Sequence, residues 1–248
     1  MIYNNLIEID LFGLYGSQLN TIPTDSTFTL TSPINQTNFS AILGTLPFKI
    51  SGCIIPGIDV RLKEPKICQD CYSVVHYNST IIRVLCDGHG ADGHSVAEFA
   101  VKYIEKYFKK HYSNFRADPK SMSTKVMQKC DKKILEAMDC DLSGTTAIFL
   151  MIEKGVVYCG SLGDSRAIVG YLSTSPETAV LRPNKFFRKI KCDRGFRTAP
   201  LSLDQKPEHS DEVLRIRNSG GIVEKYTDAA GRNVGPYRVR NRMVLDLD

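Results

Sequence analysis

Acidic residues, glycines and a histidine gather where β-like segments of this chain end. Asp87 closes the apolar run "IIRVLC" and is followed by Gly88 and His89. A carboxylate at the end of a buried strand is held rigidly, and adjacent glycines let backbone oxygens approach a ligand, so this corner suits a hard divalent cation. The Gly88 carbonyl would add a second oxygen, and His89 could donate a proton to a leaving group. The alternative interpretation is an Asx turn that caps the following helix.

Two further aspartates could join this corner. Asp70 precedes "CYSVV", and a hairpin with "IIRVLC" would bring its carboxylate close to that of Asp87. Two like charges at such a distance repel unless a cation or a proton lies between them. Asp141 precedes "LSGTTA" and the next strand-like run. For both residues the alternative is an ordinary loop or turn aspartate before a strand.

The elements that must position these residues come in groups. "CYSVVHY" and "TIIRVLCDG" predict a hairpin around "NST". Apolar residues at three- and four-residue steps predict helices over residues 94–112 and 123–138. "TTAIFLMIEKGVVYCGSLGDSRAIVGYL" predicts three strands, and "SDEVLRIRNSGG" predicts a short helix that ends at glycine. Grouped strands and helices favour an α+β layered sandwich over a doubly wound sheet.

Length and charge narrow the class of protein. The 248 residues, 42% of them hydrophobic, suffice for a sizeable core. The net charge is +5, from 32 basic and 27 acidic residues, with no long block of like charges, so we expect no nucleic-acid partner. The sequence has no apolar stretch of the roughly 18 residues that a membrane span needs and no signal-peptide pattern. We therefore expect no membrane partner and a location in the cytoplasm, with the nucleus as an additional location. We also expect a monomer.

The chain is predicted to divide near residue 45. Residues 1–45 include a stretch rich in Ser, Thr, Asn and Pro, which is typical of a variable N-terminal extension. Residues 46–248 are expected to form the domain that carries the candidate site residues.

Eight cysteines are present, and only Cys68 and Cys71 have C-x-x-C spacing. Because no second pair completes a zinc set, we expect buried, reduced thiols rather than a metal site or disulfides.

Five motifs, in this order, resemble the metal-dependent protein phosphatases of type 2C, most closely the plant and protist branches. They are "CQDCYSVV", "VLCDGHGADGHSVAEF", "DLSGTTA", "YCGSLGDSRAIV" and "LSLDQKPEHSDEVLRIRNSGGIV", and the resemblance extends from about Gly57 to Arg240. It implies a four-layer α-β-β-α sandwich of two antiparallel sheets flanked by helices. In that family the Gly163–Arg166 segment is a structural turn and strand rather than part of the catalytic machinery.

The resemblance also implies a function. It implies hydrolysis of phosphoserine and phosphothreonine in phosphorylated protein substrates, by a water that two Mg²⁺ or Mn²⁺ ions activate. Asp87 would bridge both ions, and the Gly88 carbonyl would bind one of them. Asp70 would contact the metal ions directly or through a bound water. Asp141 matches the acid of a weaker third metal site, and His89 the general acid.

The family also carries a basic residue that holds the phosphate. Arg61, Lys63 and Lys66 are the candidates, and their spacing does not choose between them.

The resemblance ends before two late aspartate motifs of the family. After "GPYRVR" the family continues to a Gly-Asp and an Asp-Asn that bind metal, whereas this sequence ends in "NRMVLDLD". We therefore expect a chain truncated at its C-terminus that lacks the last strands. The alternative function is a catalytically inactive pseudophosphatase, or a fragment that acts as an interaction module.

Overall fold

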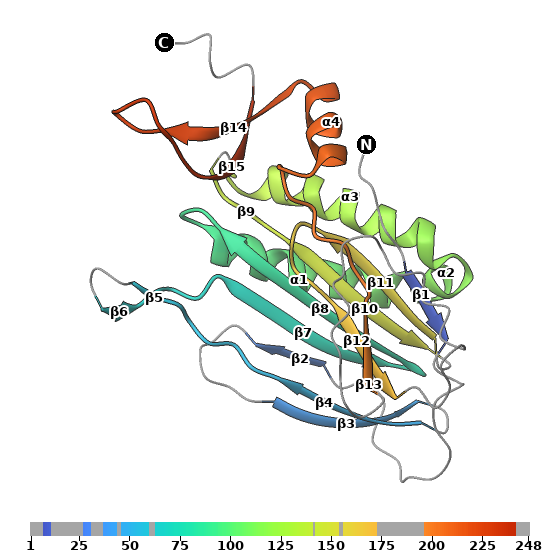
Figure 1. The fold of residues 1–248 in the computed structure, drawn as a ribbon. Coiled ribbons are helices and arrows are strands. Elements are labelled where there is room, and N and C mark those ends of the chain that lie inside the picture. Colours follow the sequence, from blue (N-terminus) through green and yellow to red (C-terminus); the bar gives the residue numbers. More distant parts are fainter. Residues whose placement is uncertain are drawn as a thin grey trace. The chain divides into compact units, whose positions relative to one another are not determined.

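The computed structural model describes residues 7–10, 27–30, 37–43, 46–59, 63–140, 142–153, 156–172 and 196–241. The chain forms two compact units, residues 2–203 and residues 204–248, and each is described by itself (Figure 1).

A seven-stranded antiparallel sheet forms the centre of the first unit. Its strand order is β1 (Ile7–Asp10), β11 (Val156–Leu162), β10 (Ala147–Glu153), β8 (Thr80–His89), β7 (Asp70–Tyr77) and β2 (Thr27–Leu30), with short β9 (Gly144–Thr145) beside the end of β8. The predicted β7–β8 hairpin is confirmed. Asn78 lies in its two-residue turn with a φ of 54°, a left-handed conformation that asparagine tolerates better than most residues.

Three strands come from the predicted N-terminal extension. They are β1, β2 and β3 (Thr37–Leu43), and β3 pairs with β4 (Leu46–Gly52). The first two lie at opposite edges of the large sheet. The boundary at residue 45 stays a prediction.

Three helices pack against one face of the large sheet. They are α1 (Gly93–Lys110), α2 (Tyr112–Ala117) and α3 (Pro119–Ala137). The two predicted helices correspond to α1 and α3. The Asp118 carboxylate caps α3 by accepting from the Ser121 backbone N–H at 3.0 Å, and Pro119 occupies the first turn, where no N–H is needed. Six-residue α2 was not predicted, because it is too short to show a helical period.

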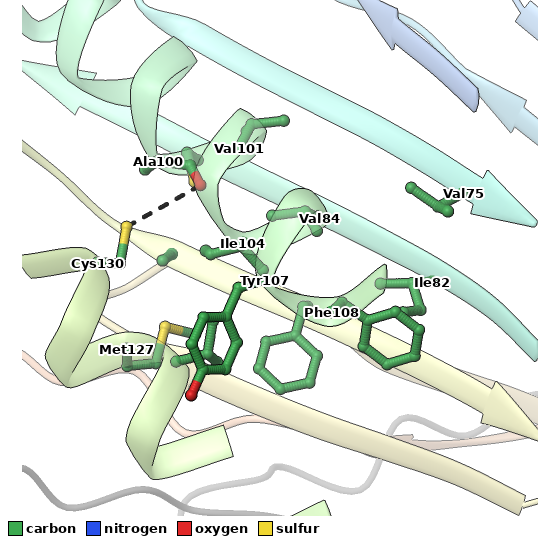
Figure 2. Close-up of a cluster of buried hydrophobic side chains, with 14 of the residues drawn as sticks. Val75, Ile82, Val84, Ala100, Val101, Ile104, Tyr107, Phe108, Met127 and Cys130 are labelled. Carbon is green, nitrogen blue, oxygen red and sulfur yellow. Dashed lines mark hydrogen bonds between the residues drawn. The ribbon is translucent and has the colours of Figure 1, made fainter. Parts of the chain in front are cut away.

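The core between the sheet and these helices is apolar and closely packed. Figure 2 shows α1 and α3 meeting over the strands, where the Cys130 thiol lies 4.0 Å from the Ala100 carbonyl oxygen. The buried members from the strands include Val75, Ile82 and Val84, and those from the helices include Ile104, Phe108, Phe115, Val126 and Met127.

Alternate residues of each strand point to the other face of the sheet, away from the helices. Tyr72, Val74 and Ile81 form a second buried cluster there with Ile54. Strands β12 (Ile168–Leu172) and β13 (Phe196–Pro200) form a small sheet, and Leu201 after it packs on Ile148, Val157 and Cys159 of β10 and β11. The expected α+β class of antiparallel sheets with outer helices is confirmed.

The second unit contains α4 (Ser210–Asn218) and a hairpin of β14 (Gly221–Thr227) and β15 (Asn233–Asn241). As predicted, α4 ends at glycine, since Gly220 follows it with a φ of 84°. Ile216 is buried on the face of α4 that contacts β14. The hairpin itself was not predicted.

Four of the seven described cysteines are buried thiols, namely Cys71, Cys86, Cys130 and Cys159, while Cys53 is exposed. Burial raises the pKa of Cys71 to about 11 and that of Cys130 to about 12, so these thiols are poorly reactive. Cys192 lies outside the described residues. Within the described ranges, no helix is long and apolar enough to cross a membrane.

Candidate active site

The two predicted carboxylates lie side by side at one end of the β7–β8 hairpin. Asp70 and Asp87 are directly opposite each other in the strand register. Directly opposite residues of antiparallel strands have Cβ atoms about 5 Å apart on the same face. By the period of two, this is the face of Tyr72 and Ile81, away from the helices. The hairpin alone therefore builds an acidic pair.

The acidic pair is electrostatically strained. Partial burial raises the pKa of Asp70, and the charge of Asp87 raises it further. A hydrogen bond between the two carboxyl groups adds to the rise, because it favours a protonated Asp70. Burial and the neighbouring carboxylate thus act in the same direction. A divalent cation would relieve both costs.

Close backbone packing explains the glycines of the corner Asp87–Gly90. A Cβ on Gly88 would lie 2.1 Å from the Gly93 carbonyl oxygen and 2.8 Å from that of Gln69, so only glycine fits there. Gly90 has a φ of 86°, which glycine adopts without strain. These contacts hold the end of β8 against the start of α1.

His89 lies at the end of β8, opposite Gly144 of β9. A Cβ on Gly144 would come within 2.8 Å of the His89 Nε2 atom, so the imidazole rests against the glycine backbone. The side chain is exposed to solvent. An exposed imidazole beside the acidic pair can exchange protons with a bound substrate.

Two polar residues outside the predicted site hold the corner from its flanks. The Gln69 side chain donates through Nε2 to the Gly90 carbonyl at 2.6 Å, and its backbone carbonyl accepts from the Gly88 N–H at 3.0 Å. The Ser143 hydroxyl accepts from the Asp92 N–H at 3.0 Å. Nothing in the local sequence signals either contact.

The Thr146 hydroxyl holds Asp87 itself, and the Ser165 hydroxyl contacts that of Thr146. Thr146 Oγ1 accepts from the Asp87 N–H at 3.0 Å and lies 2.7 Å from the Ser165 hydroxyl. The contact between Thr146 and Ser165 joins the "GTTA" and "GDSR" motifs, which lie apart in the sequence, next to the predicted metal ligand Asp87.

The predicted phosphate-binding residues are only partly placed. Lys63 and Lys66 are exposed, in and just after the small hairpin of β5 (Ile58–Asp59) and β6 (Glu64–Pro65). In the part of the chain that the structure describes, no ion pair joins either lysine to Asp70 or Asp87. Arg61 and the predicted metal ligand Asp141 lie outside the described residues. The choice among the three basic residues stays open.

The donor chemistry of the acidic pair fits a hard divalent cation. Asp70 and Asp87 offer carboxylate oxygens, and the Gly88 carbonyl adds a backbone oxygen. The described residues contain no set of three His, Cys, Asp or Glu side chains that could hold a metal ion. Since Mg²⁺ takes six ligands, water or residues outside the described ranges would complete its coordination.

Comparison with known proteins places this site in a family. The family model for protein phosphatase 2C matches residues 69–236, more than half of the chain, including the acidic pair and His89. This chain belongs to the protein phosphatase 2C family.

Individual relatives agree with this assignment. The chain is 28% identical over 204 residues to the mitochondrial protein phosphatase 1K of Xenopus laevis, a match that covers 77% of this chain and 46% of the relative. It is 31% identical over 140 residues to the probable protein phosphatase 2C 55 of rice (Oryza sativa subsp. japonica), covering 55% of this chain and 30% of the relative. The matched part thus spans about a third to a half of the length of these curated relatives.

A solved structure supports the fold of this protein phosphatase 2C chain. A sex-determining protein of C. elegans overlays with a TM-score of 0.50 and 15% sequence identity, over 84% of this chain and 42% of the other. At this identity the likeness concerns the fold alone.

Proposed function

We propose that this chain acts as a metal-dependent protein serine/threonine phosphatase that hydrolyses phosphoserine and phosphothreonine in phosphorylated proteins. The observation that carries the proposal is the acidic pair Asp70–Asp87, placed by the β7–β8 register inside the part of the chain that matches the family. The two carboxylates and the Gly88 carbonyl would hold Mg²⁺ or Mn²⁺, two ions in the proposed active state. When bound, the ions would supply Lewis-acid chemistry by lowering the pKa of a coordinated water and neutralising phosphoryl charge.

The protein's own residues have separate tasks in this proposal. Asp87 presents its carboxylate from β8, which pairs with β7 on one side and with β10 and β9 on the other. His89 donates a proton to the departing serine or threonine oxygen, for which its exposed position beside the acidic pair is suited. One of Arg61, Lys63 and Lys66 would hold the phosphate by charge. Asp141 would serve a weaker third metal site.

Location and assembly stay predictions. The buried, reduced thiols support a reducing compartment such as the cytoplasm or nucleus. A monomer is proposed.

Substitution of Asp87 tests the function directly. We expect the 248-residue chain to hydrolyse p-nitrophenyl phosphate and a phosphothreonine peptide in the presence of Mn²⁺. Hydrolysis should stop when EDTA removes the ion. Asp87→Asn should lower the rate by at least about a hundredfold, since metal affinity and water activation both depend on this carboxylate. Initial rates at several Mn²⁺ concentrations provide the measurement.

The matched control is Asp131→Asn, an exposed carboxylate on α3 that should leave the rate unchanged. A folded wild-type chain that binds Mn²⁺ but hydrolyses neither substrate would contradict the phosphatase proposal and favour an interaction module.

A further inference from the structure

We propose that Thr146 is a positioning residue for the Asp87 carboxylate, and that the Gly163–Ser165 turn acts on the metal site through Thr146. The inference rests on the metal-dependent function proposed above. It assigns a task to two motifs, "GTTA" and "GDSR", to which the proposed chemistry gives none.

Thr146 binds both backbone polar groups of Asp87. Its own N–H donates to the Asp87 carbonyl at 2.9 Å, and its hydroxyl accepts from the Asp87 N–H at 3.0 Å. Thr146 lies between β9 and β10, where a regular antiparallel ladder would use its carbonyl as the second acceptor. Its carbonyl accepts instead from the Thr145 hydroxyl at 2.9 Å. At Asp87, the predicted metal ligand, the Thr146 hydroxyl therefore takes the place of the Thr146 carbonyl as the acceptor for the backbone N–H.

The turn after β11 fixes the orientation of the Thr146 side chain. The Ser165 hydroxyl lies 2.7 Å from Thr146 Oγ1. Gly163 lies against the methyl group, because a Cβ there would be 2.8 Å from Thr146 Cγ2. Contacts on the hydroxyl and on the methyl group together select one rotamer of a β-branched side chain. The turn thus directs the hydroxyl toward Asp87.

The backbone of Asp87 needs this support. Its side chain is exposed and lies opposite a second carboxylate that repels it when no cation is present. On the β7 side, Gly88, the residue after Asp87, is held by a hydrogen bond from its N–H to the Gln69 carbonyl. On the β9–β10 side, the Asp87 N–H depends on the Thr146 hydroxyl. Groups that orient metal ligands typically change metal affinity by about 10- to 100-fold when they are removed.

The test is Mn²⁺ binding by titration calorimetry on the full chain, with Thr146→Val, Thr146→Ser and Ser165→Ala. Thr146→Val keeps the shape and removes the acceptor, so we expect the Kd for Mn²⁺ to rise about tenfold or more. Thr146→Ser restores the acceptor and should recover most of the affinity, and Ser165→Ala should give a smaller rise. The apparent Mn²⁺ activation constant should rise in parallel, while kcat at saturating Mn²⁺ stays close to that of the wild type.

Thr80→Val is the matched control. Thr80 is a buried threonine at the other end of β8, and its hydroxyl lies 3.0 Å from that of Tyr112. Thr80→Val should lower the Tm without changing the Kd for Mn²⁺. In the metal-free protein, hydrogen exchange of the Asp87 amide, followed by NMR, should be faster in Thr146→Val and unchanged in Thr80→Val.

The outcomes separate the two proposals. A wild-type chain that binds Mn²⁺, with Thr146→Val binding equally well and its Asp87 amide equally protected, would overturn the positioning role and leave the proposed function standing. A folded wild-type chain that does not bind Mn²⁺ would overturn both. If Thr146→Val does not fold, Ser165→Ala decides by the same two measurements, since it removes only the outer hydroxyl.

Discussion

At the scale of single residues, the acidic pair is a feature that the metal-free fold tolerates rather than needs. Asp70 and Asp87 are directly opposite each other, and the pKa of Asp70 is raised by burial and by its neighbour. A fold selected for stability alone would place an opposite charge or an amide at one of these positions. The unfavourable pair is therefore itself an indication of a ligand.

We predict that Asp70→Asn stabilises the metal-free chain. Asparagine keeps the shape, removes one charge and can donate an N–H to Asp87. Removing a like-charged cross-strand pair is worth about 0.2–1 kcal/mol, or roughly 0.4–4 °C in Tm for a chain of this size. Thermal unfolding in EDTA measures the gain, with Asp131→Asn as the control for charge alone. A lower Tm for Asp70→Asn would show that the pair is stabilising, against this interpretation.

At the scale of elements, the site depends on the junction between β8 and α1. Gly88 near the end of the strand and Gly93 at the start of the helix approach so closely that neither position has room for a methyl group. The helix is thereby fixed against the strand end that carries Asp87 and His89.

We predict that Gly88→Ala destabilises the chain and weakens Mn²⁺ binding. The added Cβ would meet the Gly93 backbone at 2.1 Å, so strand and helix must separate. Such overpacking costs about 1–3 kcal/mol. Urea denaturation and Mn²⁺ titration measure the two effects. Gly57→Ala, whose Cβ would meet only the Lys66 side chain at 3.9 Å, should stay within about 0.5 kcal/mol of the wild type. Equal stability of both variants would contradict the close junction.

At the scale of the whole molecule, the chain divides into two compact units. Ile216 is the buried residue of α4, beside the β14–β15 hairpin, and Phe115 is buried among the helices of the other unit. Because each unit is compact through its own internal contacts, we expect a substitution in one unit to open that unit locally.

We predict that the effects of Ile216→Ala and Phe115→Ala are confined to their own units. Each removes a buried side chain, at a cost of about 2–5 kcal/mol. Hydrogen exchange should accelerate in residues 210–240 for Ile216→Ala and in residues 70–160 for Phe115→Ala. Loss of protection across both ranges from either substitution would show a single cooperative unit instead.

Charge is also unevenly spread over the molecule. Residues 93–138, which form the helical layer, contain 10 basic and 5 acidic residues, a net charge of +5 that equals that of the entire chain. The excess of positive charge therefore lies on the helices. The proposed phosphate-binding candidates Arg61, Lys63 and Lys66 lie outside this range of the sequence.

The sequence by itself determined the parts of this protein that depend on local pattern. The hairpin that brings Asp70 close to Asp87, the helices α1 and α3 and the end of α4 at glycine all follow from periods and turn residues within a few positions. The sequence predicted that the two carboxylates lie close together, and the two-residue turn seen in the structure fixes their direct register.

The tertiary structure alone decided how that pair is held. Thr146 reaches Asp87 across 59 positions of sequence, Ser165 reaches Thr146 across 19, and Gln69 reaches Gly90 across 21. These polar side chains have no periodic signal, because their partners are set by the pairing of distant strands and by close glycine packing. A pattern that repeats along one element can be recognised in the sequence, whereas a single hydrogen bond between elements exists only after the sheet has formed.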